Sequence, residues 1–243
     1  MNLDLTGRRA LVSGSTQGIG LAIATELARS GAAVVVNGRS EERTEHAAAA
    51  VRREVPDAEV TAVAADLASE GGAGELFKAT PEVDILVNNL GIYGAKPVFE
   101  IDDDEWRRYF EVNVLSAVRL IRHYLPGMME RGFGRVMSIA SEAAVATPLH
   151  MVHLGVTKTA LLAVTRGFAK AAAGTGVTVN SVLAGPTRGP ASEELDDPKS
   201  LTQRLIEPAE IGQMIVYLSS TQAAATTGGA IRVDGGYIDS ILP

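Results

Sequence analysis

Three glycines follow the first short run of apolar residues in this chain, and they constrain its fold more than any other feature. Gly14, Gly18 and Gly20 come directly after a strand predicted over residues 9–13. A helix is predicted from Ile19 onward, because apolar residues then recur at helical spacing. Glycines at such a junction allow a tight turn and let the backbone approach a pyrophosphate resting on the helix N-terminus. The pattern therefore predicts a dinucleotide site.

The rest of the chain alternates short β-branched strands with longer, alanine-rich helices. Strands are predicted over residues 9–13, 33–37, 59–64, 83–87, 135–139, 177–182 and 230–233. Helices are predicted after the glycine turn and over residues 40–55, 102–123, 151–173 and 208–219. Such alternation is typical of an α/β fold with a doubly wound parallel sheet, here of about seven strands with helices on both faces. No linker or repeat interrupts it, which predicts a single domain over residues 1–243.

The composition argues against several other classes of protein. The net charge is -7 and no long basic run occurs, so nucleic acid is not expected as a partner. No apolar stretch approaches the ~18 residues of a membrane span, and residues 1–9 do not resemble a signal peptide, so we expect a cytoplasmic protein. Cysteine is absent, which removes thiolate metal ligands. The acidic run over residues 102–105 is interpreted as a helix N-terminus, and no metal site is expected.

Further motifs match one known family along the whole chain. Asn-Asn-Leu-Gly at residues 88–91 follows the fourth predicted strand, Asn180 precedes a Gly-Pro pair at residues 185–186, and Val-Asp-Gly-Gly occupies residues 233–236. Together with the glycine turn, these motifs resemble the T-G-x-x-x-G-x-G and N-N-A-G fingerprints of the short-chain dehydrogenases/reductases. The resemblance implies a Rossmann fold, a nicotinamide cofactor and a small-molecule substrate with a carbonyl or alcohol group. Leu90 replaces the alanine that is usual in the second fingerprint.

The end of the second predicted strand indicates which cofactor is bound. A carboxylate there would accept the ribose hydroxyls of NAD, but this chain has Arg39 and Ser40, which can bind a 2′-phosphate. NADP(H) is therefore favoured over NAD(H), although Gln17 stands where NADP-preferring relatives often carry a second basic residue. The resemblance also implies that Asp66 meets the adenine and that Asn88 shapes the nicotinamide side. The expected cofactor-binding residues are Gly14, Ser15, Gln17, Gly18, Ile19, Gly20, Arg39, Ser40, Asp66, Leu67, Asn88, Gly91, Lys158 and Gly185.

The same resemblance locates the catalytic groups and shows that one of them is missing. In the family a serine polarises the carbonyl, a tyrosine donates the proton, a lysine four residues later makes the tyrosine acidic, and an asparagine holds a water relay. Here the serine corresponds to Ser141, the lysine to Lys158 and the asparagine to Asn113. The tyrosine is replaced by Leu154, at the expected spacing from both Ser141 and Lys158. Loss of the general acid should slow the usual reaction about 10²- to 10⁴-fold.

Three interpretations of this replacement stay open. In the first, a histidine substitutes as the acid. His150 would share the face of Leu154 if the helix already includes it, whereas His153 points about 100° away on an ideal helix. In the second, the scaffold performs a reaction that needs no tyrosine, such as isomerisation, dehydration or cyclisation. In the third, the chain binds the dinucleotide without turnover or is a disabled variant of an enzyme.

The favoured interpretation is an NADP(H)-dependent oxidoreductase with an altered proton-transfer arrangement. A long irregular segment, residues 187–207, is predicted to act as a lid over the substrate. Members of the family usually assemble through the helices that hold the counterparts of Asn113 and Lys158. The resemblance therefore implies a homodimer or homotetramer.

Overall fold

Parallel strands form one continuous sheet in the part of the chain that the structure describes. The structure is a computed structural model, and it describes residues 3–189 and 199–241. The strands are β1 (Arg9–Val12), β2 (Ala33–Gly38), β3 (Val60–Ala64), β4 (Ile85–Asn88), β5 (Gly134–Ser141), β6 (Val177–Ala184) and β7 (Ala230–Val233). Their order across the sheet is β3-β2-β1-β4-β5-β6-β7, and every neighbouring pair runs parallel.

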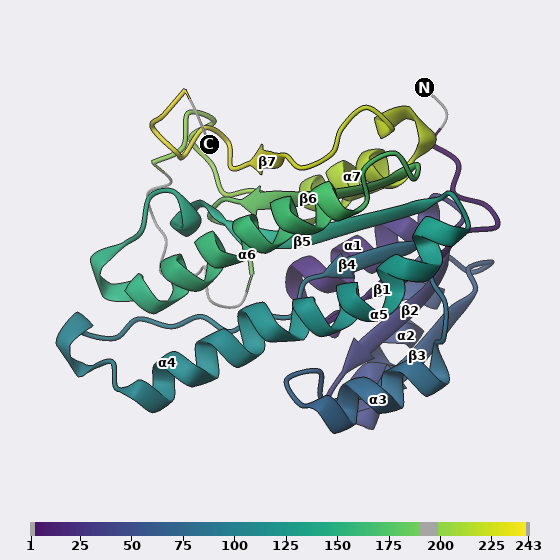
Figure 1. The fold of residues 1–243 in the computed structure, drawn as a ribbon, viewed down its shortest axis with the longest axis horizontal. Coiled ribbons are helices and arrows are strands. Elements are labelled where there is room, and N and C mark those ends of the chain that lie inside the picture. Colours follow the sequence, from purple (N-terminus) through teal and green to yellow (C-terminus); the bar gives the residue numbers. More distant parts are fainter. Residues whose placement is uncertain (1–2, 190–198, 242–243) are drawn as a thin grey trace.

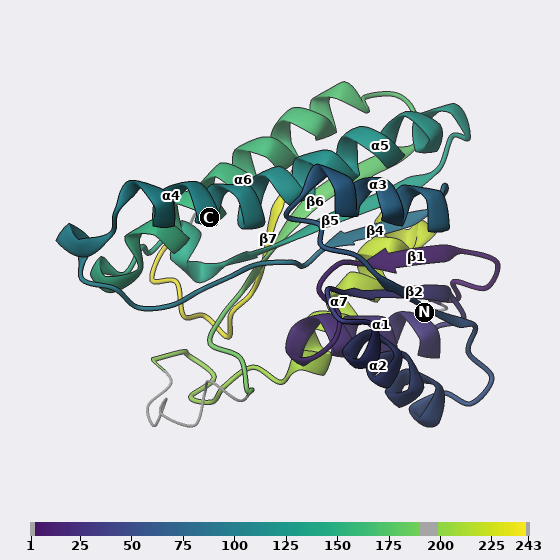
Figure 2. The ribbon, with the colours of Figure 1, turned by 90° about the horizontal axis from the view of Figure 1, so that it is seen from below.

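Helices cover both faces of this sheet. They are α1 (Gly18–Arg29), α2 (Glu41–Glu54), α3 (Glu70–Ala79), α4 (Asp103–Phe110), α5 (Ser116–Glu130), α6 (Val152–Ala171) and α7 (Pro208–Ser219). Figures 1 and 2 show α1, α2 and α7 on one face, α3, α5 and α6 on the other, and α4 extending beyond the sheet. Within the described residues, no helix combines the length and the apolar character that crossing a membrane requires.

Each face of the sheet has its own apolar core, because neighbouring residues of a strand point to opposite sides. In β1, Ala10 and Val12 pack in the core beneath α1, α2 and α7, whereas Leu11 packs in the core beneath α3, α5 and α6. All three side chains are fully buried. Burial on both faces explains why the strands are nearly continuous apolar runs. The predicted doubly wound α/β sheet with helices on both faces is confirmed.

Two predicted boundaries change in ways that affect the carboxyl edge of the sheet. β5 and β6 run further than predicted and end at Ser141 and Ala184, which pair with each other in the last register position. The helix predicted over residues 102–123 is interrupted by a π-helical turn, Glu111–Leu115, between α4 and α5. The extended ladder therefore holds Ser141 on a paired strand instead of a loop.

One helix, α3, is missing from the sequence prediction. Its segment contains Gly71, Gly72 and Gly74, and each glycine inside a helix costs about 1 kcal/mol relative to alanine. The Ser69 side chain caps the helix by accepting a hydrogen bond from the Gly72 N–H at 3.1 Å. A Cβ at Gly72 would lie 2.2 Å from the carbonyl oxygen of Asp66, so only glycine fits. Capping and packing, rather than helix propensity, stabilise this helix.

A hydrogen-bonded junction joins the carboxyl ends of β1 and β4, where the strand order reverses. The buried Ser13 Oγ accepts hydrogen bonds from the N–H groups of Asn89 and Leu90, each at 3.0 Å. The Asn89 side chain donates to the carbonyl oxygens of Ser13 and Gly14 at 3.0 and 2.9 Å. In doubly wound sheets, ligands bind at this switch point. The junction therefore fixes the glycine turn against the segment that follows β4.

Replacing Ser13 with alanine should lower the free energy of unfolding by about 1–3 kcal/mol, because two N–H groups lose their acceptor. Denaturant titration followed by circular dichroism measures the change. Ser13→Thr keeps the hydroxyl and is the matched control, for which we expect a smaller loss. Equal stability of Ser13→Ala and the parent chain would contradict the role assigned to this hydroxyl.

Candidate active site

A cavity of about 400 Å³ opens at the carboxyl edge of the sheet, beside the junction of β1 and β4. Its walls come from the glycine turn, the segment after β4, the end of β5, the start of α6 and the segment after β6. The predicted site residues that line it are Gly14, Gln17, Gly18, Ile19, Gly20, Gly91, Ser141, Lys158 and Gly185, together with Leu154 at the tyrosine position. The structure thus brings the expected cofactor and catalytic ends of the site into one cavity.

The glycine turn leaves the N-terminus of α1 open toward this cavity. Gly14 and Gly18 have φ angles of +59° and +56°, a conformation that favours glycine. A Cβ added at Gly18 would meet no atom within 4 Å, so the space beside it is open. No side chain caps α1 and its first turn has no acidic residue, so its first backbone N–H groups are available to an anion. These features fit the pyrophosphate of a dinucleotide.

Six of the predicted cofactor residues lie outside the cavity wall, among them Ser15, Asp66 and Leu67. Ser15 Oγ accepts a hydrogen bond from the Asn37 N–H at 3.0 Å and ties the glycine turn to β2. Leu67 is buried in the core beneath α3 and α5. Asp66 is exposed, and its carboxylate accepts a hydrogen bond at 3.2 Å from the backbone two residues later. Ser15 and Leu67 therefore support the frame of the site, while the Asp66 carboxylate remains accessible.

Two arginines lie at the start of α2, beside the glycine turn. Arg39 and Ser40 are exposed directly after β2, and Ser40 Oγ accepts a hydrogen bond from the Arg43 N–H at 3.4 Å. The Arg43 guanidinium donates to the Gln17 side chain at 3.1 Å. Arg43 was not among the predicted site residues, although it follows Arg39 by only four positions. A basic group thus reaches Gln17 from α2.

Asn88 and Asn113 are buried next to residues that line the cavity. Asn88 Nδ2 donates to Ser138 Oγ at 3.4 Å, and its Oδ1 has no partner within the described residues. Asn113, in the π-helical turn, accepts from the Ile92 N–H at 2.8 Å and donates to the Ile92 carbonyl and to Thr157 Oγ1, each at 3.1 Å. Asn113 therefore ties the segment after β4 to α6, and Asn88 retains an acceptor for a bound group.

Lys158 lies on α6 with its side chain buried in the cavity wall. Its Nζ donates to the Ile139 carbonyl at 2.8 Å. A Cβ at Gly91 would come within 3.3 Å of Nζ, so the glycine leaves room for the lysine. Burial lowers the pKa of Lys158 to about 8, although the nearby Glu142 raises it. The amine therefore changes its charge near pH 8.

A serine–glutamate pair at the end of β5 faces the same cavity. Ser141 Oγ donates to Glu142 Oε2 at 2.5 Å and accepts from the Ala143 N–H at 3.1 Å. Burial raises the pKa of Glu142, although hydrogen bonds from Ser141 and Ala143 act in the opposite direction. The sequence prediction did not include Glu142. Its one sequence signal was a carboxylate directly after the expected serine, and burial of that carboxylate becomes visible only in the fold.

Leu154, at the position where the family's tyrosine is expected from the sequence, lies in the wall of the cavity. Its side chain packs with Tyr109 and Ala143, and partly buried Ile92 and Met151 lie against this cluster. Only 7% of Leu154 is exposed, and the exposed part faces the cavity. The Leu154 side chain is therefore an apolar part of the wall and cannot itself donate a proton.

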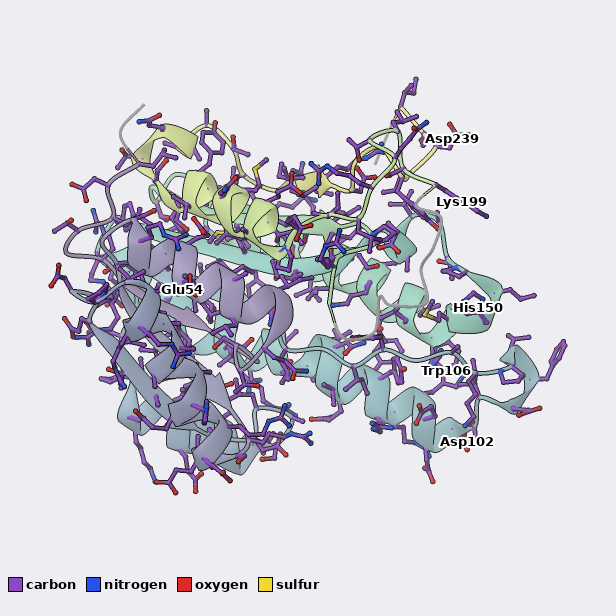
Figure 3. All side chains as sticks on the ribbon, turned by 180° about the vertical axis from the view of Figure 1, so that it is seen from behind. Glu54, Asp102, Trp106, His150, Lys199 and Asp239 are labelled. Atoms are coloured by element: carbon purple, nitrogen blue, oxygen red, sulfur yellow. The ribbon has the colours of Figure 1, made fainter. Side chains whose placement is uncertain are left out.

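The two histidines proposed as substitutes lie away from this wall. α6 begins at Val152, after Met151 with non-helical φ and ψ of -135° and 35°, so the condition for His150 to share the face of Leu154 is not met. His150 is exposed, and Figure 3 shows it at the same end of the molecule as Trp106. His153 is buried, with its ring centroid 4.0 Å from that of Tyr109 and 6.3 Å from that of Trp106. Neither histidine lines the cavity.

The predicted lid lies partly outside the described residues, at residues 190–198. In its described part, Thr187 and Arg188 line the cavity. Thr187 forms a parallel bridge with Ile206, and Arg188 pairs with Glu207 at 2.7 Å. These contacts join the two described ends of the segment beside the cavity. Its action as a lid stays a prediction.

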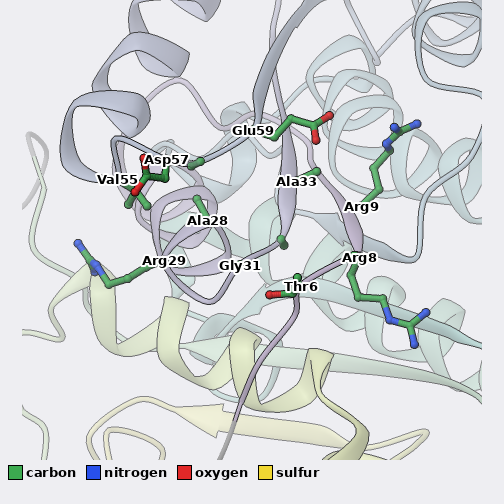
Figure 4. A pocket seen from close by; sticks show the side chains of 13 residues that line it. Thr6, Arg8, Arg9, Ala28, Arg29, Gly31, Ala33, Val55, Asp57 and Glu59 are labelled. Carbon is green, nitrogen blue, oxygen red and sulfur yellow. The ribbon is translucent and has the colours of Figure 1, made fainter.

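A second hollow, of about 560 Å³, lies at the opposite, amino edge of the sheet (Figure 4). Two of the arginines that border it already have protein partners. Arg8 lies over the Phe133 ring, 3.6 Å from its centroid, and Arg29 pairs with Glu54 at 3.2 Å. None of the predicted cofactor or catalytic residues borders this hollow. The hollow at the amino edge is the larger of the two, but the cavity at the carboxyl edge holds the predicted residues and is therefore the candidate active site.

The strand order and the cavity at the switch point define an α/β protein of the Rossmann type. Residues 14–238 match the family model described as enoyl-(acyl carrier protein) reductase. The uncharacterized oxidoreductase YvaG of Bacillus subtilis is 44% identical, over 100% of both chains. The 3-oxoacyl-[acyl-carrier-protein] reductase FabG of Vibrio cholerae is 31% identical, over 96% of this chain and 98% of FabG.

Solved structures agree with these sequence relatives. L-sorbose reductase from Gluconobacter frateurii matches with a TM-score of 0.92 and 30% identity, over 99% of this chain and 100% of the reductase. The chain belongs to the short-chain dehydrogenase/reductase family. It is thus a member of a family of oxidoreductases.

Lys158→Met should stabilise the protein at neutral pH and reduce the pH dependence of its stability. Because the folded-state pKa of about 8 lies below the ordinary 10.5, the unfolded chain binds more protons between these values, and stability rises with pH there. Between these two pH values, the free energy of unfolding of the parent chain should therefore rise by up to about 3 kcal/mol relative to that of Lys158→Met, at about 1.4 kcal/mol per pKa unit. Urea titrations below and above the window measure the gain, and a difference independent of pH would contradict it.

Proposed function

We propose that this protein is an NADP(H)-dependent oxidoreductase that interconverts a small-molecule carbonyl compound and the corresponding alcohol. The observation that carries the proposal is the single cavity that joins the glycine turn to Ser141 and Lys158. Gly18 and the N-terminus of α1 would hold the pyrophosphate, and Lys158 would hold the ribose beside the nicotinamide. The chain belongs to a family of oxidoreductases, which supports a reaction of this redox class.

Each side chain of the cavity has a role that its chemistry supports. The reduced nicotinamide, when bound, supplies the hydride of the reaction. Ser141 would orient the substrate oxygen by a hydrogen bond, and the apolar wall at Ile92 and Leu154 would exclude water from the reacting atoms. Because Leu154 carries no acidic hydrogen, the proton must reach the substrate from another group than in the family's usual arrangement.

The preference for NADP(H) is based on the cations at the start of α2. Arg39 is exposed directly after β2, and Arg43 contacts Gln17 on the glycine turn. Guanidinium groups bind phosphate through charge-assisted hydrogen bonds. The related L-sorbose reductase was solved with NADPH, whereas a related 3-oxoacyl reductase of Brucella melitensis was solved with NAD. The proposal for this chain therefore depends on its own arginines.

Two expectations from the sequence accompany this proposal. Assembly as a homodimer or homotetramer would bury apolar side chains on the helices that hold Asn113 and Lys158, such as Leu115 and Val156, which are 41% and 39% exposed. The second expectation is a cytoplasmic location.

Arg39→Gln and Arg43→Gln should each weaken NADPH binding about 10-fold, because each removes a charge-assisted hydrogen bond of about 1.5 kcal/mol to the 2′-phosphate. NADH has no 2′-phosphate, so its binding should not change. Calorimetric titration measures both dissociation constants. Arg53→Gln, in the last turn of the same helix, is the matched control. An equal loss for NADH would show that the arginines do not select the phosphate.

Leu154→Tyr tests whether the parent chain has its own proton donor. We expect the parent chain to consume NADPH on at least one member of a panel of aldehydes, ketones and quinones. Tyrosine should then add less than about 10-fold, below the 10²- to 10⁴-fold that a general acid contributes where none exists. Leu154→Phe adds a ring without the hydroxyl and separates the effect of size from that of the acid.

The opposite outcome of this experiment also has a definite meaning. If only Leu154→Tyr consumes NADPH, the pocket binds the cofactor but the parent chain has no proton donor. A non-redox reaction or a binding protein without turnover would then replace the proposed function.

A further inference from the structure

Glu142 carries the one carboxyl group among the described residues that line the cavity, and the roles above leave it unused. Ser141 is the last residue of β5, where it pairs with Ala184 of β6, so a fixed ladder holds its position. Its Oγ lies 2.5 Å from Glu142 Oε2, the distance of a strong hydrogen bond between a hydroxyl and a carboxyl group. Both residues line the cavity that also contains Leu154 and Lys158.

The surroundings of Glu142 raise its pKa above the ordinary value. Burial raises its pKa, and the negative charge of Asp234, in the segment after β7, raises it further. Arg232 pairs with Asp234 at 2.9 Å and holds that carboxylate in place. Lys158 faces Glu142 from α6, and the negative charge of Glu142 raises the pKa of this lysine. Arg188, also in the cavity wall, is engaged with Glu207.

We propose that Glu142 supplies the proton that the missing tyrosine hydroxyl would have given, and that the proton travels to the substrate through Ser141. This inference depends on the proposed function, because it assumes reduction of a carbonyl group in this cavity. It differs from that function in naming the donor. It also assigns a role to a carboxyl group that the family's catalytic set does not include.

The hydrogen-bonding capacity of Ser141 permits this route. A hydroxyl oxygen has two acceptor sites and one donor hydrogen. With Glu142 protonated, Oγ would accept from the carboxyl group and from the Ala143 N–H, which it already accepts at 3.1 Å, and its own hydrogen would be free for the substrate oxygen. With Glu142 ionised, the Ser141 hydrogen instead bonds the carboxylate. The charge of Glu142 therefore decides which way the serine donates.

The reaction balances with this single donor. The carbonyl carbon gains a hydride from the reduced nicotinamide cofactor, and the carbonyl oxygen gains the Ser141 hydroxyl proton as the C=O double bond becomes a single bond. Ser141 regains a proton from the Glu142 carboxyl group, which is left as a carboxylate and is reprotonated from water. Oxidation of the alcohol runs the same transfers in reverse and requires Glu142 to start as the carboxylate.

The pH dependence follows from these two starting states. Reduction requires protonated Glu142, so its rate should be constant at low pH and fall as the pH rises through the raised pKa of this group. Oxidation requires the carboxylate, so its rate should rise over the same interval. A histidine donor would leave both transitions in place when Glu142 is replaced.

Glu142→Gln keeps the size and hydrogen bonding of the side chain but removes the proton. It should lower the rate of NADPH-dependent reduction about 10²- to 10⁴-fold and abolish its fall with rising pH, while the dissociation constant of NADPH stays unchanged. The same substitution in a Leu154→Tyr background should cost less than about 10-fold, because the tyrosine then donates the proton. That double variant also shows that Glu142→Gln folds.

A second measurement needs no cofactor. Infrared difference spectra of the protein alone, recorded against pH, should show a protonated carboxyl band that persists above the ordinary titration range of glutamate and is absent from Glu142→Gln. Loss of this band at an ordinary glutamate pKa would overturn the proposal for Glu142, whatever the activity.

The outcomes separate the two proposals. If the parent chain turns over and Glu142→Gln keeps its rate and pH profile, Glu142 is not the donor and the oxidoreductase function stands. If NADPH does not bind, the proposed function fails, and the infrared titration alone then decides the state of Glu142.

Discussion

The hydrogen-bonded junction between β1 and β4 is the constraint on which the rest of the site depends. Parallel strands buried on both faces expose their polar backbone groups only at their ends, so a ligand must be bound there. At this end, Ser13 and Asn89 satisfy each other's backbone groups across the two strands. An added Cβ at Gly20 would lie 2.4 Å from Asn89 Nδ2, so the asparagine side chain leaves room only for glycine at position 20. The junction thereby sets where α1 begins and which space stays open beside it.

The side chains that the resemblance assigned to catalysis also hold the backbone of the site. Asn113 satisfies both backbone groups of Ile92 and reaches Thr157 on α6, while Lys158 bonds the carbonyl of Ile139 in β5. Their positions are thus fixed by partners other than the Leu154 side chain. The apolar residue at position 154 therefore leaves the lysine and the asparagine in place.

The fold could be predicted from the sequence because its signals are local: β-branched runs, a glycine turn, and helix periods between them. The features that escaped prediction depend on contacts between distant segments. The three glycines of α3 argue against a helix until Ser69 and the packing around Gly72 are known. Arg43 becomes part of the site only because α2 starts beside Gln17. His150 was weighed on the assumption of a longer α6, and the non-helical backbone at Met151 removes that assumption.

The apolar side chain of Leu154 and the raised pKa of Glu142 are physically connected. Leu154 packs with Tyr109 and with Ala143, the residue after Glu142, so its apolar side chain lies beside the segment that carries this carboxyl group. An apolar wall withholds water from the Glu142 carboxyl group, and a poorly hydrated carboxyl group holds its proton more tightly. The same burial lowers the proton affinity of Lys158, so the two groups approach each other in pKa from opposite directions. Under the proposal above, an acid on β5 then serves a cavity in which Leu154, on α6, supplies none.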